Sequence, residues 1–228
     1  MFLIVQNDPD CPLGTIAGVI EEAGRSFRVA PAYRETPFPP LAGLAGVIVL
    51  GGEMGVYQTE RYPYLDRVRA FMKETVAAGV PLLGICLGGQ LLAQVLGGEV
   101  RSPSPHGEKG SHPVRLTGAG RLDPLFRGVP DPFSAFQLHN DSFAPPPSAL
   151  LLADSAACPA QAFRFAENAY GVQFHPEVDR AIVARWSELS PGEAEILASF
   201  DHHRAASDGP SRRILANFVE LASPPRQP

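Results

Sequence analysis

The sequence has few of the features that mark disulfide-stapled, zinc-binding or nucleic-acid-binding proteins. Only three of its 228 residues are cysteines, Cys11, Cys86 and Cys158, and they are odd in number and widely separated. This usage predicts a reducing compartment rather than a disulfide framework or a zinc site. The net charge is -5 and no basic cluster occurs, so nucleic acid is not an expected partner. The histidines lack metal-ligand spacing, and we expect no metal ion.

Long uninterrupted hydrophobic runs are also missing. No charged residue occurs between Glu74 and Glu99, but Pro81, two glutamines and six glycines interrupt this stretch. Its first part suits a buried strand, and its second part suits a helix that begins just after Cys86. The apolar N-terminal residues 2–5 lack a basic segment and a long hydrophobic core, so they indicate a strand rather than a signal peptide. We therefore expect a cytoplasmic protein with no membrane contact.

The order of apolar and amphipathic segments in the first half predicts an α/β fold. Strands are expected at residues 2–6, 27–30 and 46–50 and in a run that ends at residue 86, with helices at residues 14–23, 64–78 and 87–96. Strands that are separated by single helices imply right-handed crossovers and a mostly parallel sheet covered on both faces. This pattern predicts a flavodoxin-like three-layer sandwich.

The second half of the chain has a different texture. Short β-like runs follow one another between proline-rich segments, at residues 113–116, 133–138, 149–153, 160–165 and 169–174. They predict an antiparallel or mixed extension of the sheet. The last fifty residues carry apolar side chains at helical spacing, so C-terminal helices are expected. Because no repeat and no convincing linker occurs, we expect residues 1–228 to form a single domain.

The stretch GICLGGQ, residues 84–90, places Cys86 between Gly84 and Gly88. This G-x-C-x-G frame is the thiol counterpart of G-x-S-x-G, in which a strand turns sharply into a helix and presents a nucleophile. Glycine is expected at the flanking positions because larger side chains would collide with the strand and the helix. A buried cysteine that acts as a small hydrophobic residue would give the same seven letters, so this stretch alone leaves both interpretations open.

A second stretch, YGVQFHPEV at residues 170–178, favours the catalytic interpretation. YGVQF indicates a strand, so His175 and Glu177 follow its carboxyl end, as Cys86 follows the end of its own strand. Ligand sites of open α/β sheets lie beyond these strand ends, so the three side chains can meet. A thiol nucleophile needs a base, and the imidazole needs a third group that fixes its tautomer. The two stretches together predict a triad of Cys86, His175 and Glu177.

Through its segments GICLGGQLLAQVLGG and GVQFHPEV, the chain resembles the class I (triad) glutamine amidotransferases. Within this family it most resembles the stand-alone members related to the glutaminase domain of GMP synthase. GVIVLGGEMGVY at residues 46–57 is similar to the family's strand and oxyanion loop. GEKG at residues 107–110 and LHNDSF at residues 138–143 are similar to its later substrate-side segments. One position departs from the family: Glu53 stands where proline is usual, so the resemblance does not account for the rigidity of that loop.

The resemblance implies a role for each residue of the triad. Cys86 would attack the side-chain amide of glutamine and form a γ-glutamyl thioester. His175 would transfer the protons, and Glu177 would orient His175. The backbone N–H groups of Gly52 and Leu87 would hold the tetrahedral oxyanion, which needs preorganised donors. No cofactor is implied.

The resemblance also assigns the substrate's amino-acid end to three residues. Gln90 would hydrogen-bond this end, with help from backbone groups of Asn140 and Asp141. An ordinary helix-surface glutamine at residue 90 would give the same pattern, as would a capped core histidine at His139 beside Asp141. These alternatives stay open at the level of sequence.

Nothing in the chain supplies a synthase that would consume ammonia, because no ATP-binding glycine loop occurs. The favoured hypothesis is a free-standing, thiol-dependent hydrolase that acts on glutamine or another small γ-glutamyl compound. The alternative is a glutaminase subunit that delivers ammonia to a separate synthase in trans, and a non-catalytic binding module on the same fold is the least favoured. A synthase-dependent enzyme should carry an apolar docking patch, for which the candidates are Met54, Val56, Tyr57 and Phe143.

Overall fold

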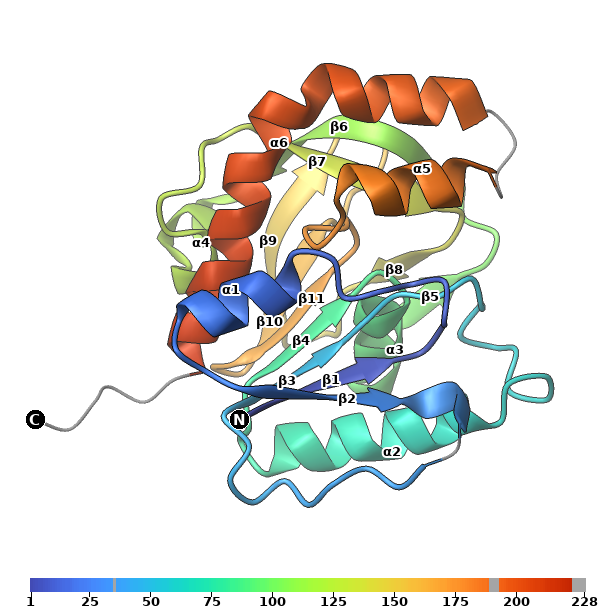
Figure 1. The fold of residues 1–228 in the computed structure, drawn as a ribbon, viewed down its shortest axis with the longest axis vertical. Helices are drawn as coiled ribbons and strands as arrows, with labels where there is room; N and C mark the ends of the chain where they lie inside the picture. The colour runs from blue at the N-terminus through green and yellow to red at the C-terminus, as the bar shows by residue number, and fades with distance from the viewer. Residues whose placement is uncertain (35, 189–192, 223–228) are drawn as a thin grey trace, which may run out of the picture.

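The computed structural model describes residues 1–34, 36–188 and 193–222. A nine-stranded sheet with the order β2-β1-β3-β4-β11-β10-β9-β6-β7 forms its centre (Figure 1). The first five strands in this order are parallel: β2 (Phe27–Pro31), β1 (Phe2–Gln6), β3 (Gly46–Val49), β4 (Leu82–Ile85) and β11 (Ala169–Val172). All residues of β3, β4 and β11 are buried, which is why they appear in the sequence as continuous apolar runs.

The other half of the sheet is antiparallel, and the predicted mixed extension is therefore confirmed. It consists of β10 (Ala162–Phe165), β9 (Leu150–Ser155), β6 (Glu108–Leu116) and β7 (Phe133–His139). β6 begins five residues before the run expected from the sequence, because its buried side chains there are the polar Glu108 and Ser111. A separate pair, β5 (Glu99–Arg101) and β8 (Ser142–Ala144), was not expected. Three-residue strands leave too short a pattern to detect.

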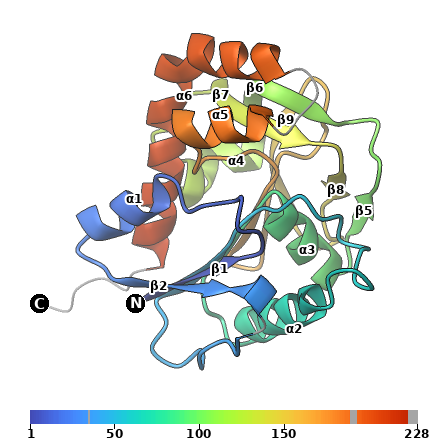
Figure 2. The same cartoon turned by 45° about the vertical axis from the view of Figure 1, so that its right-hand side comes forward.

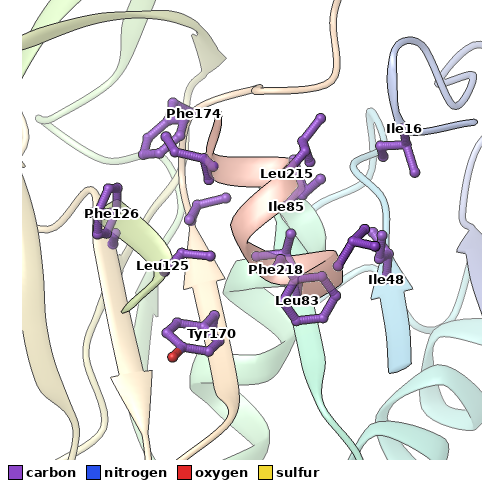
Figure 3. Packing of buried hydrophobic residues seen from close by; sticks show 14 of the residues in the cluster. Ile16, Ile48, Leu83, Ile85, Leu125, Phe126, Tyr170, Phe174, Leu215 and Phe218 are labelled. Atoms are coloured by element: carbon purple, nitrogen blue, oxygen red, sulfur yellow. The ribbon is translucent and has the colours of Figure 1, made fainter. Parts of the chain in front are cut away.

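Helices cover both faces of the sheet and give the three layers of the flavodoxin-like sandwich (Figures 1 and 2). On one face, α1 (Ile16–Glu22) and α6 (Glu193–Leu221) pack over the parallel strands. Figure 3 shows Leu215 and Phe218 of α6 near Ile48, Leu83 and Ile85 of the sheet. The other face is covered by α2 (Tyr64–Ala77) and α3 (Leu87–Val95), whose apolar residues form a second cluster with the sheet.

The C-terminal helices form a third cluster near the carboxyl ends of the strands. α5 (Arg180–Glu188) packs against the first part of α6, and together with β7 they bury Phe136, Val183, Trp186 and Phe200. α6 changes direction along its length (Figure 1), and Pro210 lies inside it. Proline bends a helix because it lacks an N–H and collides with the preceding turn. One helix therefore reaches both the core and the edge of the candidate site. The short helix α4 (Gly118–Leu122) lies on the antiparallel half.

Candidate active site

Cys86 lies at a sharp turn between β4 and α3. Its backbone has φ 50° and ψ -109°, a region that residues with a side chain rarely adopt. The flanking glycines are sterically required: a Cβ atom on Gly84 would lie 2.4 Å from the carbonyl oxygen of Gly88, and one on Gly88 would lie 2.2 Å from that of Val49. The backbone therefore makes the strand–elbow–helix turn that presents a nucleophile, and Cys86 itself is 6% exposed.

His175 and Glu177 follow β11, the strand directly beside β4. The Cys86 N–H donates to the carbonyl of Val172 at 2.8 Å, which ties the elbow to the end of β11. Glu177 Oε1 lies 2.8 Å from His175 Nδ1, and both side chains are 3% exposed. His175 Cε1 and Cys86 Cβ lie 3.2 and 3.6 Å from the position that a Cβ atom on Gly51 would occupy, and both residues line the same pocket. The structure thus brings the three predicted triad residues together.

The electrostatics of this group favour a charged imidazole. Burial on its own lowers the pKa of His175, but the neighbouring charges of Glu177 and Cys86 outweigh burial and raise the pKa to about 10. A protonated imidazole beside a cysteine favours the thiolate, which is the nucleophilic form. A cysteine beside a protonated imidazole has the parts that nucleophilic acyl transfer requires.

Two aromatic side chains hold the imidazole ring in place. Trp186 of α5 meets His175 edge to face, with ring centroids 4.9 Å apart, and Phe136 lies 6.4 Å away. The indole N–H of Trp186 donates to the carbonyl of Asp10 at 2.6 Å. Sequence reasoning placed Trp186 only on an apolar helix face, and the one signal that could have singled it out is that it is the chain's single tryptophan.

The two predicted oxyanion donors are the backbone N–H groups of Gly52 and Leu87. Gly52 lies in the loop after β3, and Leu87 is the first residue of α3. Neither N–H donates a hydrogen bond to another group in the part of the chain that the structure describes. The side chain of Leu87 is buried in the core, so only its backbone is available to a substrate. Two free donors, one of them at a helix N-terminus, suit a developing negative charge.

Gln90 is buried, at 3% exposure, rather than a helix-surface residue. Its Nε2 donates to the Asp141 carbonyl at 3.2 Å and to Gln173 Oε1 at 3.3 Å. Gln173 Nε2 lies 3.7 Å from Cys86 Sγ and donates to it. Sequence reasoning missed Gln173, although a polar residue two positions before His175 in an apolar strand was an available signal.

Asn140 and Asp141 lie in the turn after β7, and Asp141 Oδ2 would be 3.5 Å from a Cβ atom on Gly55. His139 is a capped core histidine: its Nδ1 is 2.8 Å from the Asp141 carbonyl and its Nε2 is 3.4 Å from Glu108 Oε2. Both side chains of this second pair are almost fully buried. His139 therefore supports the turn that carries Asp141.

A pocket of about 510 Å³ opens at these residues, a size typical of small-molecule sites. The predicted residues that line it are Cys86, His175, Gly52, Gln90, Asn140 and Asp141. Glu177 and Leu87 are not in the lining: Glu177 contacts His175, and the side chain of Leu87 is buried in the core. Nowhere in residues 1–34, 36–188 and 193–222 are three His, Cys, Asp or Glu side chains grouped as metal ligands. No helix of the described chain is long and apolar enough to cross a membrane.

Comparison with known proteins decides the family. A sequence profile described as glutamine amidotransferase class-I matches residues 15–181. The chain belongs to this family. It is accordingly an enzyme of the class I glutamine amidotransferase type, with a domain suited to hydrolysis or transfer of the glutamine amide, and the predicted resemblance and fold class are confirmed.

Two curated proteins illustrate what this amidotransferase is similar to. The glutamine amidotransferase-like protein YfeJ of Salmonella typhimurium is 33% identical over 161 residues, which are 69% of this chain and 67% of YfeJ. The glutamine-hydrolysing GMP synthase of Aeropyrum pernix is 35% identical over 182 residues, 76% of this chain but 33% of the synthase. The chain therefore spans about a third of the length of that GMP synthase.

Solved structures match the amidotransferase over nearly its whole length. The crystal structure of a glutamine amidotransferase from Thermotoga maritima has a TM-score of 0.85 and 30% identity, and the match covers 96% of this chain and 97% of that one. A glutamine amido transferase from Methylobacillus flagellatus gives a TM-score of 0.86 at 27% identity, with coverage of 96% and 94%. The C-terminal helices, which the sequence motifs did not cover, are thus part of a shared architecture.

Proposed function

We propose that the protein hydrolyses a γ-glutamyl amide through a γ-glutamyl thioester on Cys86. The observation that carries this proposal is the placement of Cys86 and the His175–Glu177 pair beyond the carboxyl ends of the adjacent strands β4 and β11. Both ends open into the same pocket. A thiol, a base and an orienting carboxylate in this order are the parts that nucleophilic acyl transfer requires.

The steps follow from the groups present. The Cys86 thiolate adds to the amide carbonyl carbon, and the N–H groups of Gly52 and Leu87 stabilise the oxyanion. His175 donates its proton to the departing nitrogen, the carbon–nitrogen bond breaks, and ammonia or an amine leaves. Neutral His175 then removes a proton from water, whose oxygen attacks the thioester. Glutamate leaves, and the thiol is restored when the proton returns from His175.

The amino-acid end of the substrate is assigned to Gln90, Asn140 and Asp141. Gln90 uses its Nε2 within the protein, so its Oε1 is the atom left to accept a hydrogen bond from a substrate ammonium group. Asn140 and Asp141 line the pocket on a turn whose Asp141 carbonyl already accepts from Gln90 and His139. This turn and Gln90 together form a fixed wall against which the substrate is oriented.

A free-standing hydrolase is favoured over a synthase-dependent subunit by the burial of the expected docking patch. Met54, Val56 and Phe143 are 8%, 0% and 3% exposed and belong to the core. Tyr57 is 56% exposed, but its hydroxyl donates to the Val100 carbonyl. The four residues therefore offer one exposed aromatic anchor, Tyr57, rather than the cluster of anchors on which association depends. The alternative, ammonia delivery to a synthase in trans, is supported by the similarity to the GMP synthase of Aeropyrum pernix.

We further propose one domain over residues 1–228, because α6 contacts α1, α5, β6 and β7 and so joins both halves of the sheet. A cytoplasmic location is proposed on the cysteines, all three of which are free.

The chemistry is tested with a glutamine-mimicking electrophile and mass spectrometry. Cys86 is expected to be the labelled residue, because burial raises the pKa of Cys158 to about 11 and, together with Asp8, raises that of Cys11. Labelling of Cys11 or Cys158 in place of Cys86 would contradict the proposal. In parallel, ammonia release from glutamine and glutamate release from γ-glutamyl peptides should both disappear in Cys86→Ala.

The choice between hydrolase and subunit is tested by a pull-down from native lysate beside the same substrate assays. Hydrolysis by the isolated chain with no stoichiometric partner supports the free-standing enzyme. Recovery of an ATP-dependent synthase, with activity that rises on its addition, would establish the alternative. No hydrolysis of either substrate, with ligand binding intact in Cys86→Ala, would favour a binding module.

A further inference from the structure

The predicted oxyanion donor Gly52 lies in a loop of residues 51–53, here called the oxyanion loop. This loop lies against the reacting groups: a Cβ atom on Gly51 would be 3.2 Å from His175 Cε1 and 3.6 Å from Cys86 Cβ. Two consecutive glycines leave the backbone free to rotate. A rotation of the peptide between Gly51 and Gly52 would turn the donor N–H away from the substrate, so something must hold this peptide in place.

The two residues that follow β1 hold the loop on both sides of that peptide. Asn7 Nδ2 donates to the Leu50 carbonyl at 2.7 Å, which fixes the peptide before Gly51. Asp8 Oδ2 accepts from the Glu53 N–H at 3.0 Å, which fixes the peptide after Gly52. The central peptide, which carries the Gly52 N–H, therefore lies between two pinned neighbours.

These braces are built into the core. Asn7 is 0% exposed and Asp8 is 5% exposed, so water competes little for their hydrogen bonds. The carbonyl of Asn7 accepts from the Tyr64 hydroxyl at 2.8 Å, which anchors the end of β1 to α2. Asp8 Oδ1 accepts from the Asp10 N–H at 2.9 Å. Each oxygen of the Asp8 carboxylate thus accepts from one backbone donor, at the point where Asp8 lines the pocket.

The identity of residue 53 explains why a carboxylate is needed. Proline, which the resemblance leads one to expect here, fixes its own φ and has no N–H. Glu53 has a freely rotating φ and an N–H that requires an acceptor. Asp8 supplies that acceptor. By holding the Glu53 N–H it restrains rotation about the N–Cα bond of residue 53, which a proline ring would also restrain.

We propose that Asp8 is a positioning residue for amide hydrolysis, which holds the Glu53 N–H so that the Gly52 N–H stays directed at the reacting carbonyl. The inference rests on the proposed function of Cys86 and Gly52. It assigns to Asp8 an effect on the tetrahedral transition state and none on thiolate formation or on binding of the substrate.

Kinetics of Asp8→Ala and the isosteric Asp8→Asn test the proposal. Loss of an oriented oxyanion donor is expected to lower kcat by about tenfold to a hundredfold, with KM changed by less than about twofold. Alkylation of Cys86 by iodoacetamide needs no oxyanion donor, so its rate should not change. Asp123→Asn is the matched control, because Asp123 is as buried as Asp8 and accepts from a backbone N–H, that of Leu125 at 3.0 Å, but does not line the pocket. Adding Glu53→Pro to Asp8→Ala should recover most of the lost kcat.

Hydrogen exchange at the Glu53 amide tests the brace without reference to activity. The amide should exchange slowly in the wild type. In Asp8→Ala it should exchange about tenfold faster or more, because the Glu53 N–H has lost its acceptor. Unchanged kcat, a loss confined to KM, or unchanged protection of this amide would overturn the proposal. A wild type that cleaves neither substrate would instead refute the proposed function, and the exchange measurement would still decide whether Asp8 holds the loop.

Discussion

At the scale of single residues, Cys86 shows how a local backbone conformation is maintained by its surroundings. Its positive φ is costly for a residue with a side chain, by about 1–3 kcal/mol. The conformation persists because the elbow is tied on both sides: Cys86 N–H donates to Val172, and the Cys86 carbonyl accepts from the Gln90 N–H at 2.9 Å. The strained turn places Cys86 in the lining of the pocket.

This strain predicts an unusual order of stability for two inactive variants. Glycine adopts positive φ without a penalty, whereas alanine retains the strain. Cys86→Gly should therefore have a free energy of unfolding about 1 kcal/mol higher than Cys86→Ala, although glycine is normally the less stable choice. Urea denaturation of the two variants measures the difference. A higher stability for Cys86→Ala would show that the elbow is not strained.

The charge of His175 gives a second prediction at this scale. Because Glu177 and Cys86 raise its pKa from 6.5 to about 10, the ring stays protonated through neutral pH and loses its charge only near the upper value. Glu177→Gln removes the carboxylate that favours the charged form, so the midpoint should move down towards 6.5. NMR titration of the labelled imidazole, assigned with His175→Gln, measures both midpoints. Equal midpoints near 6.5 would contradict the buried ion pair.

At the scale of elements, the elbow joins β4, α3 and β3 through backbone contacts that leave no room for a methyl group. Gly88→Ala would place its Cβ 2.2 Å from the carbonyl oxygen of Val49. Backbone atoms cannot yield as a flexible side chain can, so the helix and the sheet must move apart. The glycines of the motif are therefore fixed by packing between elements, and not by the chemistry of the thiol.

We expect Gly88→Ala to lower the free energy of unfolding by about 3 kcal/mol or more, as steric overpacking does. Gly18→Ala is the matched control. Gly18 lies within α1, and nothing would lie within 4 Å of its added Cβ. Alanine there should raise the stability by about 0.5–1 kcal/mol, because it suits a helix better than glycine. Denaturant titrations that gave both substitutions the same sign would refute this account of the elbow.

At the scale of the whole molecule, α6 couples the core to the candidate site. Its last turns bury Phe218 against Phe2 and Tyr170, while its first turns place Phe200 against Phe136 beside the imidazole of His175. One helix thus contributes to two clusters that lie on different parts of the sheet. If the chain unfolds as a unit, a destabilising substitution in one cluster should lower the stability of the other cluster as well.

Phe218→Ala should lower the free energy of unfolding by about 3–5 kcal/mol, since a fully buried aromatic ring is removed. Trp186, the single tryptophan, belongs to the other cluster. Its fluorescence and the far-UV circular dichroism should report the same shifted urea midpoint. A tryptophan transition that stayed at the wild-type midpoint would show that the two clusters unfold separately, against the proposed single domain.

The sequence by itself determined the parallel half of the fold and the chemistry of the candidate triad. Fully buried strands such as β3 and β4 are continuous apolar runs, and α2 shows its apolar residues at helical spacing, so local pattern suffices. Cys86 and His175 were recognisable because each follows such a strand, and parallel strands end at one edge. These features depend on neighbours in the chain.

Only the tertiary structure decided the polar interior. Glutamate and glutamine are usually surface residues, yet Glu108 and Gln173 are buried. Their hydrogen-bond partners, His139 and Ser155 for Glu108 and Cys86 for Gln173, come from distant segments. Asp8 likewise gains its role from Glu53, 45 residues away. A buried polar group is tolerated only where its hydrogen-bond partner is present. The sequence pattern shows which apolar residues will be buried. A polar residue can be buried only with a hydrogen-bond partner, and that partner is brought to it only when distant segments of the chain pack together.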